Sequence, residues 1–240
     1  MTDARQPILA HLEELRKRLF KASLAVVVAA IVAFVFRGWI FDILVEPYEK
    51  VVDDRNLVFF RPTEAFSLFM RLSLFGGFIL ASPIVLYQLW AFVSPGLHRR
   101  EKRFLIPITF VLALLFLAGV FMGYWSLERG LGFLLDFGGD RLDATIGGDF
   151  YLSFAIRFIL VFGFAFEFPV FLFTAAAVGI VDHRALSRGR RWAVLLIVTI
   201  GAVVTPSGDP LTLLLLSVPL YIFYEITIWV VRFTVGRKRR

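Results

Sequence analysis

The sequence predicts an all-α membrane protein in which six transmembrane helices form one domain over residues 1–240. Of the 240 residues, 59% are hydrophobic and 28 are phenylalanine, and the mean hydropathy is +0.79. A soluble core of this length cannot hide so much apolar surface. The sequence also contains repeated apolar runs, most of them at least about 20 residues long, which is the length that a helix needs to cross the hydrocarbon layer. Each run is therefore a candidate span, and the polar segments between the runs alternate in charge.

The candidate spans lie near residues 21–41, 65–93, 104–127, 150–181, 191–205 and 210–231. The second and fourth are longer than a perpendicular helix requires. We expect them to tilt or to bend at Pro83 and Pro169, because proline removes an intrahelical donor. The fifth has only about 13 uninterrupted apolar residues, from Trp192 to Val204. We expect it to cross a thinned bilayer or to cross incompletely.

The segment before the first span, residues 1–20, has the pattern of an amphipathic helix at the membrane surface. Its apolar residues follow helical spacing at Ile8, Leu12, Leu15 and Leu19. Glu13 and Lys17 stand four residues apart, as do Glu14 and Arg18, in the order that favours ion pairs on a helix. Taken alone, the pattern predicts a solvated helix face that runs into the first span.

The basic residues predict that both termini are cytoplasmic. With six spans, 18 lysines and arginines fall on the side of the termini and 6 on the opposite side. Cytoplasmic segments are the ones enriched in these residues, and the acidic residues are distributed the other way. The isoelectric point of about 10 therefore reflects membrane topology, and we expect no nucleic acid partner.

The residue types that carry catalysis are scarce. The chain has no cysteine, which excludes thiol chemistry and disulfides. His11, His98 and His183 fall in predicted cytoplasmic segments, outside any HExxH pattern and away from a serine at bilayer depth. We therefore expect no enzyme, no metal and no cofactor, and an intramembrane hydrolase is disfavoured. Binding, conduction and assembly remain as functions.

One carboxylate, Glu167, lies deep within an apolar run. An ionisable group at this depth costs several kcal/mol and marks a functional site. Arg71 and Arg157 lie near the predicted external ends of their spans, where the guanidinium can snorkel to the interface. For Glu225 we expect a structural hydrogen bond to Tyr or Thr. From the residues alone, Glu167 leaves three roles open: a catalytic acid, an ion ligand, or the proton site of a proton-coupled secondary transporter.

Another carboxylate, Glu101, stands among the cations of residues 98–103. Its local role would be to neutralise these neighbours. Together with Glu14, however, it is one of the few carboxylates on a strongly basic face, and carboxylates bind guanidinium groups in bidentate fashion.

Several motifs, taken in order, resemble the TatC family, the multispanning component of the twin-arginine protein translocase. They are HLEELRKRL (His11 to Leu19), the external Pro47, SPIVLYQLWAFVSPGL (Ser82 to Leu97) followed by Glu101, FGFAFEFPV (Phe162 to Val170), and a TP turn before the sixth span. The resemblance covers essentially the whole chain. It implies a concave, cupped arrangement of the six helices, in which the fifth and sixth are short.

The resemblance also implies a receptor. TatC-like proteins recognise the paired arginines of a folded substrate's signal peptide at the cytoplasmic face. Carried over to this sequence, the implied binding residues are Glu14, Arg16, Phe92, Pro95 and Glu101.

Partners in the membrane are implied as well. Glu167 would face the concave surface and meet single-span TatA/TatB-type subunits. A further polar contact would fall on Asp209 and Thr212, because a glutamine that many relatives carry after this turn is absent. Pro47 and Pro62 would belong to an external cap. The implied setting is a self-associating complex in the lipid of a prokaryotic plasma (inner) membrane.

Overall fold

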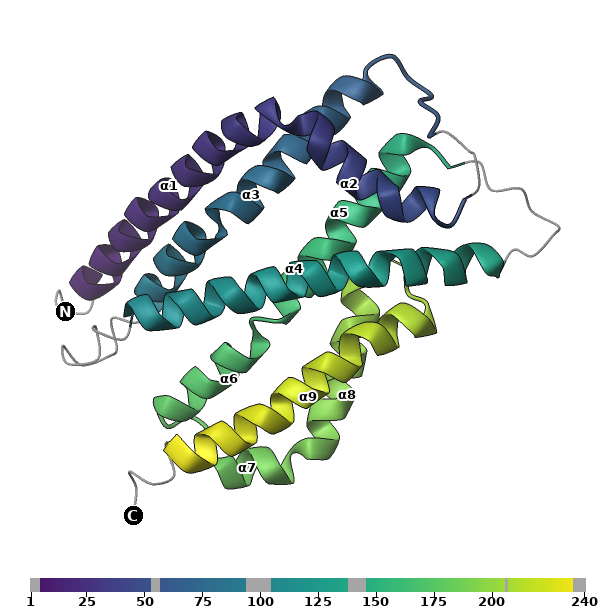
Figure 1. Cartoon of the computed structure of the whole chain (residues 1–240). Coiled ribbons are helices and arrows are strands. Elements are labelled where there is room, and N and C mark those ends of the chain that lie inside the picture. Colours follow the sequence, from purple (N-terminus) through teal and green to yellow (C-terminus); the bar gives the residue numbers. More distant parts are fainter. Residues whose placement is uncertain (1–4, 53–56, 94–104, 138–145, 206, 235–240) are drawn as a thin grey trace. The chain divides into compact units, whose positions relative to one another are not determined.

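Helices make up most of the part of the chain that the structure describes. The computed structural model describes residues 5–52, 57–93, 105–137, 146–205 and 207–234. The helices are α1 (Arg5–Val35), α2 (Arg37–Glu49), α3 (Glu64–Val93), α4 (Leu105–Asp136), α5 (Gly148–Ala165), α6 (Phe168–Ala177), α7 (His183–Arg188), α8 (Arg190–Val204) and α9 (Pro210–Thr234) (Figure 1). The described residues also contain an isolated β-bridge between Val58 and Gly147.

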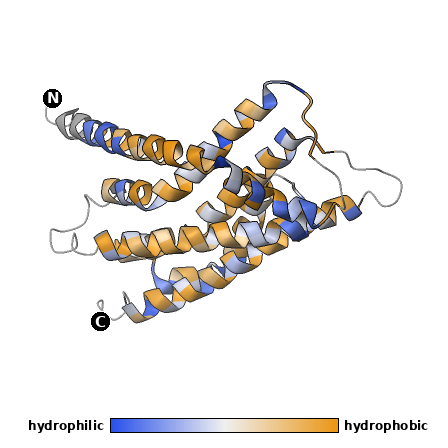
Figure 2. Ribbon diagram, turned by 45° about the horizontal axis from the view of Figure 1, so that its top comes forward, coloured by the Kyte–Doolittle hydropathy of each residue, from blue (hydrophilic) through white to orange (hydrophobic). Residues whose placement is uncertain are grey.

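Five stretches in the described residues are long and apolar enough to cross a membrane. They are His11–Val35, Glu64–Phe92, Ile106–Asp136, Gly148–Ala177 and Pro210–Thr234. Hydrophobic residues predominate along the long helices (Figure 2). Many of them are exposed, which suits helices whose outer faces contact lipid tails.

The chain divides into two compact units. Unit 1 comprises Met1–Ile43 and Phe59–Leu114, and unit 2 comprises Leu44–Val58 and Leu115–Arg240. Helices α2 and α4 each pass from one unit to the other. In unit 1, α1 and α3 pack along their lengths.

Small residues allow the close approach of α1 and α3 in unit 1. A Cβ atom added at Gly77 would lie 2.5 Å from both the backbone nitrogen and the Cα of Ala30. At Gly76 it would lie 3.2 Å from the Cβ of Ala33. Helices in membranes associate through such small-residue contacts, because lipid leaves little hydrophobic drive between helices.

Unit 2 has a core of aromatic residues around α5. Phe158 and Phe162 are fully buried, and their rings lie 4.9 Å apart. Glycines again permit close packing, since a Cβ at Gly119 of α4 would lie 2.5 Å from the carbonyl oxygen of Phe162. The start of α5 is fixed by Tyr151, whose hydroxyl donates a 2.7 Å hydrogen bond to the carbonyl of Leu44 within α2.

The helix boundaries confirm part of the sequence prediction. The amphipathic segment does run into the first span, as the single helix α1. The fourth span is interrupted between Ala165 and Phe168, and Pro169 lies in the first turn of α6, where proline is tolerated. The short fifth helix is α8, which has 15 residues and is not among the five long candidates. Six spans therefore remain a prediction.

Two predicted boundaries were wrong. The first span was expected to reach residue 41, but α1 ends at Val35 and α2 begins at Arg37. Arg37 donates a 3.1 Å hydrogen bond to the carbonyl of Phe34, which satisfies a group that the helix end leaves unpaired. The sixth helix was expected to be short, but α9 has 25 residues. It continues past Arg232, whose guanidinium lies over the ring of Trp229 and is accommodated there by a cation–π contact.

Candidate functional site

Side chains of α1 and α3 meet in unit 1 to form what we call the N-terminal cluster: His11, Glu14 and Arg18 on α1, with Gln88 and Phe92 on α3. The rings of His11 and Phe92 stack with their centroids 4.4 Å apart and an interplanar angle of 17°. His11, Glu14 and Arg18 recur at spacings of three and four residues, so they lie on one face of α1. Helix packing therefore brings Phe92 to the same face as Glu14.

The Glu14 carboxylate is half-buried and already holds a guanidinium. Its Oε1 accepts hydrogen bonds from Nε and Nη2 of Arg18 at 2.9 and 2.6 Å. Nη1 of Arg18 lies 3.5 Å from Oε1 of Gln88 on α3. The cluster thus places a carboxylate and an amide oxygen around one guanidinium, that of Arg18 from the same helix.

Glu13 and Arg16 differ from Glu14 in their surroundings. Glu13 forms a 2.7 Å ion pair with Lys17, and both side chains are mostly exposed. Arg16 is exposed as well. The two predicted i,i+4 pairs are thus confirmed, and Glu13 does not share the face of Glu14. The predicted binding residues Pro95 and Glu101 lie outside the described residues.

Glu167 is buried in unit 2, with only 2% of its surface exposed. Both carboxylate oxygens lack a hydrogen-bond partner among the described residues. The side chain is therefore enclosed within unit 2, and its predicted contact with a partner helix stays a prediction. The reason for this burial is the interruption between α5 and α6, which leaves Glu167 at the N-cap of α6, beside Phe166, whose ring packs edge-on against Phe223 of α9.

Asp209 and Thr212 form the N-terminal cap of α9. Oδ1 of Asp209 accepts a 2.8 Å hydrogen bond from the backbone N–H of Thr212, and Oδ2 accepts one from its hydroxyl. Burial alone would raise the pKa of Asp209, but the hydrogen bonds from Ser207 and Thr212 outweigh it and hold this pKa below its usual value. Both residues are buried, so a partner helix would reach their polar atoms only by opening the cap.

The two predicted cap prolines differ in environment. Pro47 is buried within α2 in unit 2, next to Tyr48, whose ring lies 5.0 Å from that of Tyr151. Pro62 is exposed and lies in unit 1, in the turn before α3.

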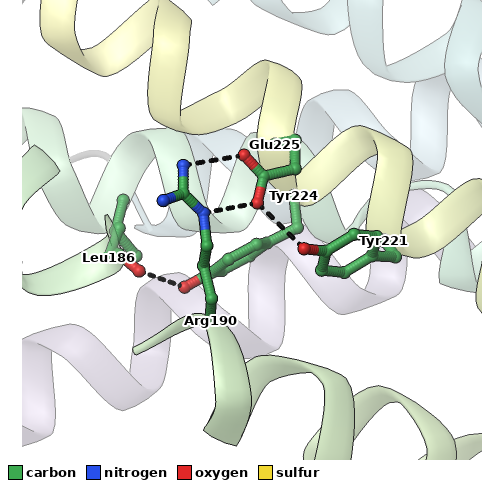
Figure 3. A network of polar contacts seen from close by, with 5 residues as sticks. All are labelled: Leu186, Arg190, Tyr221, Tyr224 and Glu225. Atoms are coloured by element: carbon green, nitrogen blue, oxygen red, sulfur yellow. Dashed lines mark hydrogen bonds and ion pairs between the residues drawn. The ribbon is translucent and has the colours of Figure 1, made fainter. Parts of the chain in front are cut away.

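A polar network joins α7, α8 and α9 (Figure 3), and the sequence predicted only its tyrosine contact to Glu225. Arg190 of α8 binds Glu225 of α9 through two hydrogen bonds of 2.7 and 3.0 Å. Tyr221 donates a 3.1 Å bond to the same carboxylate, which confirms the predicted tyrosine contact of Glu225. Tyr224 donates a 2.7 Å bond to the carbonyl of Leu186 in α7. The opposite charges of Arg190 and Glu225 were evident from the sequence, but no sequence pattern indicated that these two residues, 35 positions apart, would be in contact.

Comparison with known proteins gives one consistent family. Residues 10–219 match the family described as Sec-independent protein translocase protein (TatC). Proteins of that name in Carboxydothermus hydrogenoformans and Aquifex aeolicus are each 36% identical, over 97% of this chain and 96% and 98% of theirs. The Frankia casuarinae protein is 38% identical over 94% of this chain, which covers only 65% of that longer protein.

A solved structure agrees with this result. The crystal structure of the twin-arginine translocase receptor TatC in DDM superposes with a TM-score of 0.79 at 37% sequence identity. The match covers 92% of this chain and 99% of the crystallised one.

Proposed function

The chain belongs to the TatC family of Sec-independent protein translocase proteins, and we propose that its N-terminal cluster binds the twin-arginine signal peptide of folded substrates. As a TatC protein it is a non-enzymatic, multi-pass membrane component of protein transport in prokaryotes. The observation that carries the proposal is the Glu14 to Arg18 contact, in which a carboxylate of the cluster already binds a guanidinium.

Binding proceeds by exchange of one arginine for another. A signal-peptide arginine takes the position of Arg18 on Glu14, and the released Arg18 moves towards Gln88, which it approaches at 3.5 Å. The stacked pair of His11 and Phe92 supplies an apolar surface for the residues next to the arginines. Glu101 binds the second arginine of the signal peptide, and Pro95 supports the loop that carries Glu101. The positive charge of Arg16 repels cationic side chains that are not paired with a carboxylate.

The proposed topology has six spans and cytoplasmic termini. Helix α8 is the fifth span, and its 15 residues rise about 22 Å, less than the hydrocarbon thickness of about 30 Å. The bilayer is therefore thinned around it, which agrees with the cupped arrangement that we propose for the complete fold. The basic residues support the orientation, and it places the N-terminal cluster at the cytoplasmic face.

Single-span TatA/TatB-type subunits are the proposed partners in the membrane, within a complex that contains several copies of the chain. Glu167 is the proposed polar contact, reached when a partner helix parts the packing at the break between α5 and α6. The Asp209 and Thr212 cap holds the turn before α9 in place for such a partner. Pro47 and Pro62 belong to the external cap.

The experiment compares Glu14→Lys with Glu13→Lys as a matched control. Both reverse one charge on adjacent residues of α1, but only Glu14 belongs to the cluster. Binding of a fluorescent twin-arginine signal peptide to the full chain in lipid nanodiscs should weaken about tenfold or more in Glu14→Lys and change little in Glu13→Lys. Glu101→Lys should behave like Glu14→Lys.

Two outcomes would reject this assignment. One is equal peptide affinity in Glu14→Lys and in the unmodified protein. The other is equal weakening in Glu13→Lys and Glu14→Lys, which would indicate a general effect of charge. Membrane insertion, measured by the yield of folded monomer, should be the same in all variants.

A further inference from the structure

Unit 2 contains a long apolar groove with a volume of about 1150 Å³. It is lined by residues from α5 to α9, and nearly all of them are apolar, including Leu160, Phe168, Trp192 and Leu196. Several of these side chains are exposed, for example Leu196 at 56%. In a membrane the groove is open to lipid.

One strong cation lines this groove. Arg157 of α5 is exposed and lies on the groove wall. Within the described part of the chain it has no carboxylate partner and no hydrogen bond. A guanidinium in apolar surroundings is costly unless it meets an anion, so the groove supplies a site for a negatively charged group next to an apolar channel.

The depth of Arg157 matches the end of the short helix α8. Arg157 lies nine residues after Gly148, which is about 13 Å along α5. The end of α8, at Val203 and Val204, lines the same groove as Arg157. In the proposed topology α8 is the fifth span and is about 8 Å shorter than the hydrocarbon thickness, so the headgroup layer beside it would be drawn inward towards Arg157.

We propose that this groove binds one phospholipid, with an acyl chain along α8 and the phosphate on Arg157. The groove follows α8 from Trp192 to Thr205, about 20 Å along the helix, which exceeds the roughly 15 Å of hydrocarbon in one leaflet. An acyl chain therefore fits lengthwise. Bidentate binding of phosphate is the chemistry to which a guanidinium is suited.

A partner helix would need an acidic residue at the depth of Arg157 to meet the guanidinium, whereas every phospholipid carries a phosphate. In the proposed topology Arg157 lies in the external half of its span, so the bound lipid belongs to the external leaflet. Binding of the phosphate to Arg157 does not depend on that topology.

The test uses the full chain in phosphatidylethanolamine vesicles that contain a phosphatidylglycerol probe with a photoactivatable diazirine halfway along one acyl chain. After irradiation, labelled peptides are mapped by mass spectrometry. Labels should concentrate on residues 160–172 and 192–205. Arg157→Gln should lower this labelling at least fivefold, and Arg157→Lys should lower it less. Arg129→Gln, which removes an exposed arginine of α4 outside the groove, is the matched control and should leave it unchanged.

Two further measurements separate the phosphate from the acyl chain and from partners. A diacylglycerol probe, which lacks phosphate, should label the groove of the unmodified protein as weakly as phosphatidylglycerol labels Arg157→Gln. Leu196→Trp, which fills the groove and keeps Arg157, should also reduce labelling. Signal-peptide binding should be unchanged in Arg157→Gln, so this result is independent of the proposed receptor function.

The proposal is overturned if Arg157→Gln is labelled as strongly as the unmodified protein, or if both probes label the groove equally. It is also overturned if crosslinkers at Leu196 capture a single-span subunit in cells while lipid labelling is absent, because a helix is then the occupant. Circular dichroism and monomer yield verify that each variant is folded.

Discussion

The guanidinium of Arg190 binds the carboxylate of Glu225 through two separate hydrogen bonds, of 2.7 and 3.0 Å, and so joins the start of α8 to the middle of α9. Bidentate pairs fix orientation as well as distance. Since Tyr224 also binds the carbonyl of Leu186, the whole corner formed by α7 and α8 is held against α9. The network lies at the end of the apolar groove where Leu186, Trp192 and Tyr224 form the wall.

Loss of this pair should loosen the corner. Arg190→Lys keeps the charge but cannot form the two-point contact, and Glu225→Gln keeps the shape but removes the charge. Each should lower the Tm of the detergent-purified protein by a few degrees, because the pair is partly exposed and surface pairs contribute modestly. The double variant should lose less than the sum of the two single losses, and a strictly additive loss would show that the two side chains do not interact.

The packing of α1 on α3 predicts a strong effect at one glycine. In Gly77→Ala, the new Cβ would fall 2.5 Å from backbone atoms of Ala30, and backbone cannot move aside as a flexible side chain can. We expect destabilisation of about 1–3 kcal/mol and weaker signal-peptide binding, because Glu14 and Phe92 would separate. Gly38→Ala is the control, since nothing lies within 4 Å of its added Cβ. Equal stability of the two variants in thermal unfolding would contradict the close contact.

The sequence predicted what depends on local pattern and missed what depends on packing. Length and hydropathy located the five long spans, and helical spacing predicted the pair of Glu14 and Arg18. Gln88 could not be predicted as a neighbour of Arg18, because the two meet only after α3 packs on α1. The burial of Glu167 was also hidden, since an apolar run looks the same whether its helix is continuous or interrupted.

Glu167 gives a prediction in which stability and function oppose each other. The buried carboxyl group of Glu167 has no hydrogen bond to any residue that the structure describes. Such burial is costly, so Glu167→Leu should raise the Tm of the isolated protein. It should also reduce copurification of the single-span subunits and export of substrates. Glu167→Gln, which keeps a polar group of the same shape, should retain much of the activity.

The same two variants test the transporter alternative. Equal loss of export in Glu167→Gln and Glu167→Leu, together with proton-driven solute uptake by vesicles that contain the isolated chain, would favour proton chemistry at Glu167 over partner contact. A receptor should transport no solute by itself.

The cap of α9 predicts a defined pH dependence. The pKa of Asp209 is lower in the folded protein than its ordinary value of 3.8, so its stabilising effect is fully present above that value and is lost as the pH falls through the folded pKa. Asp209→Ala should therefore destabilise the protein by about 1 kcal/mol at pH 7, and this difference should shrink below pH 3.8.

Thr212→Val keeps the carboxylate of Asp209 and its hydrogen bond from the backbone N–H but removes the hydroxyl, so the loss of stability should be smaller than in Asp209→Ala at pH 7. Thermal unfolding in detergent from pH 3 to pH 7 measures both variants, and a difference between Asp209→Ala and the unmodified protein that does not change with pH would show that the cap does not depend on the ionised carboxylate.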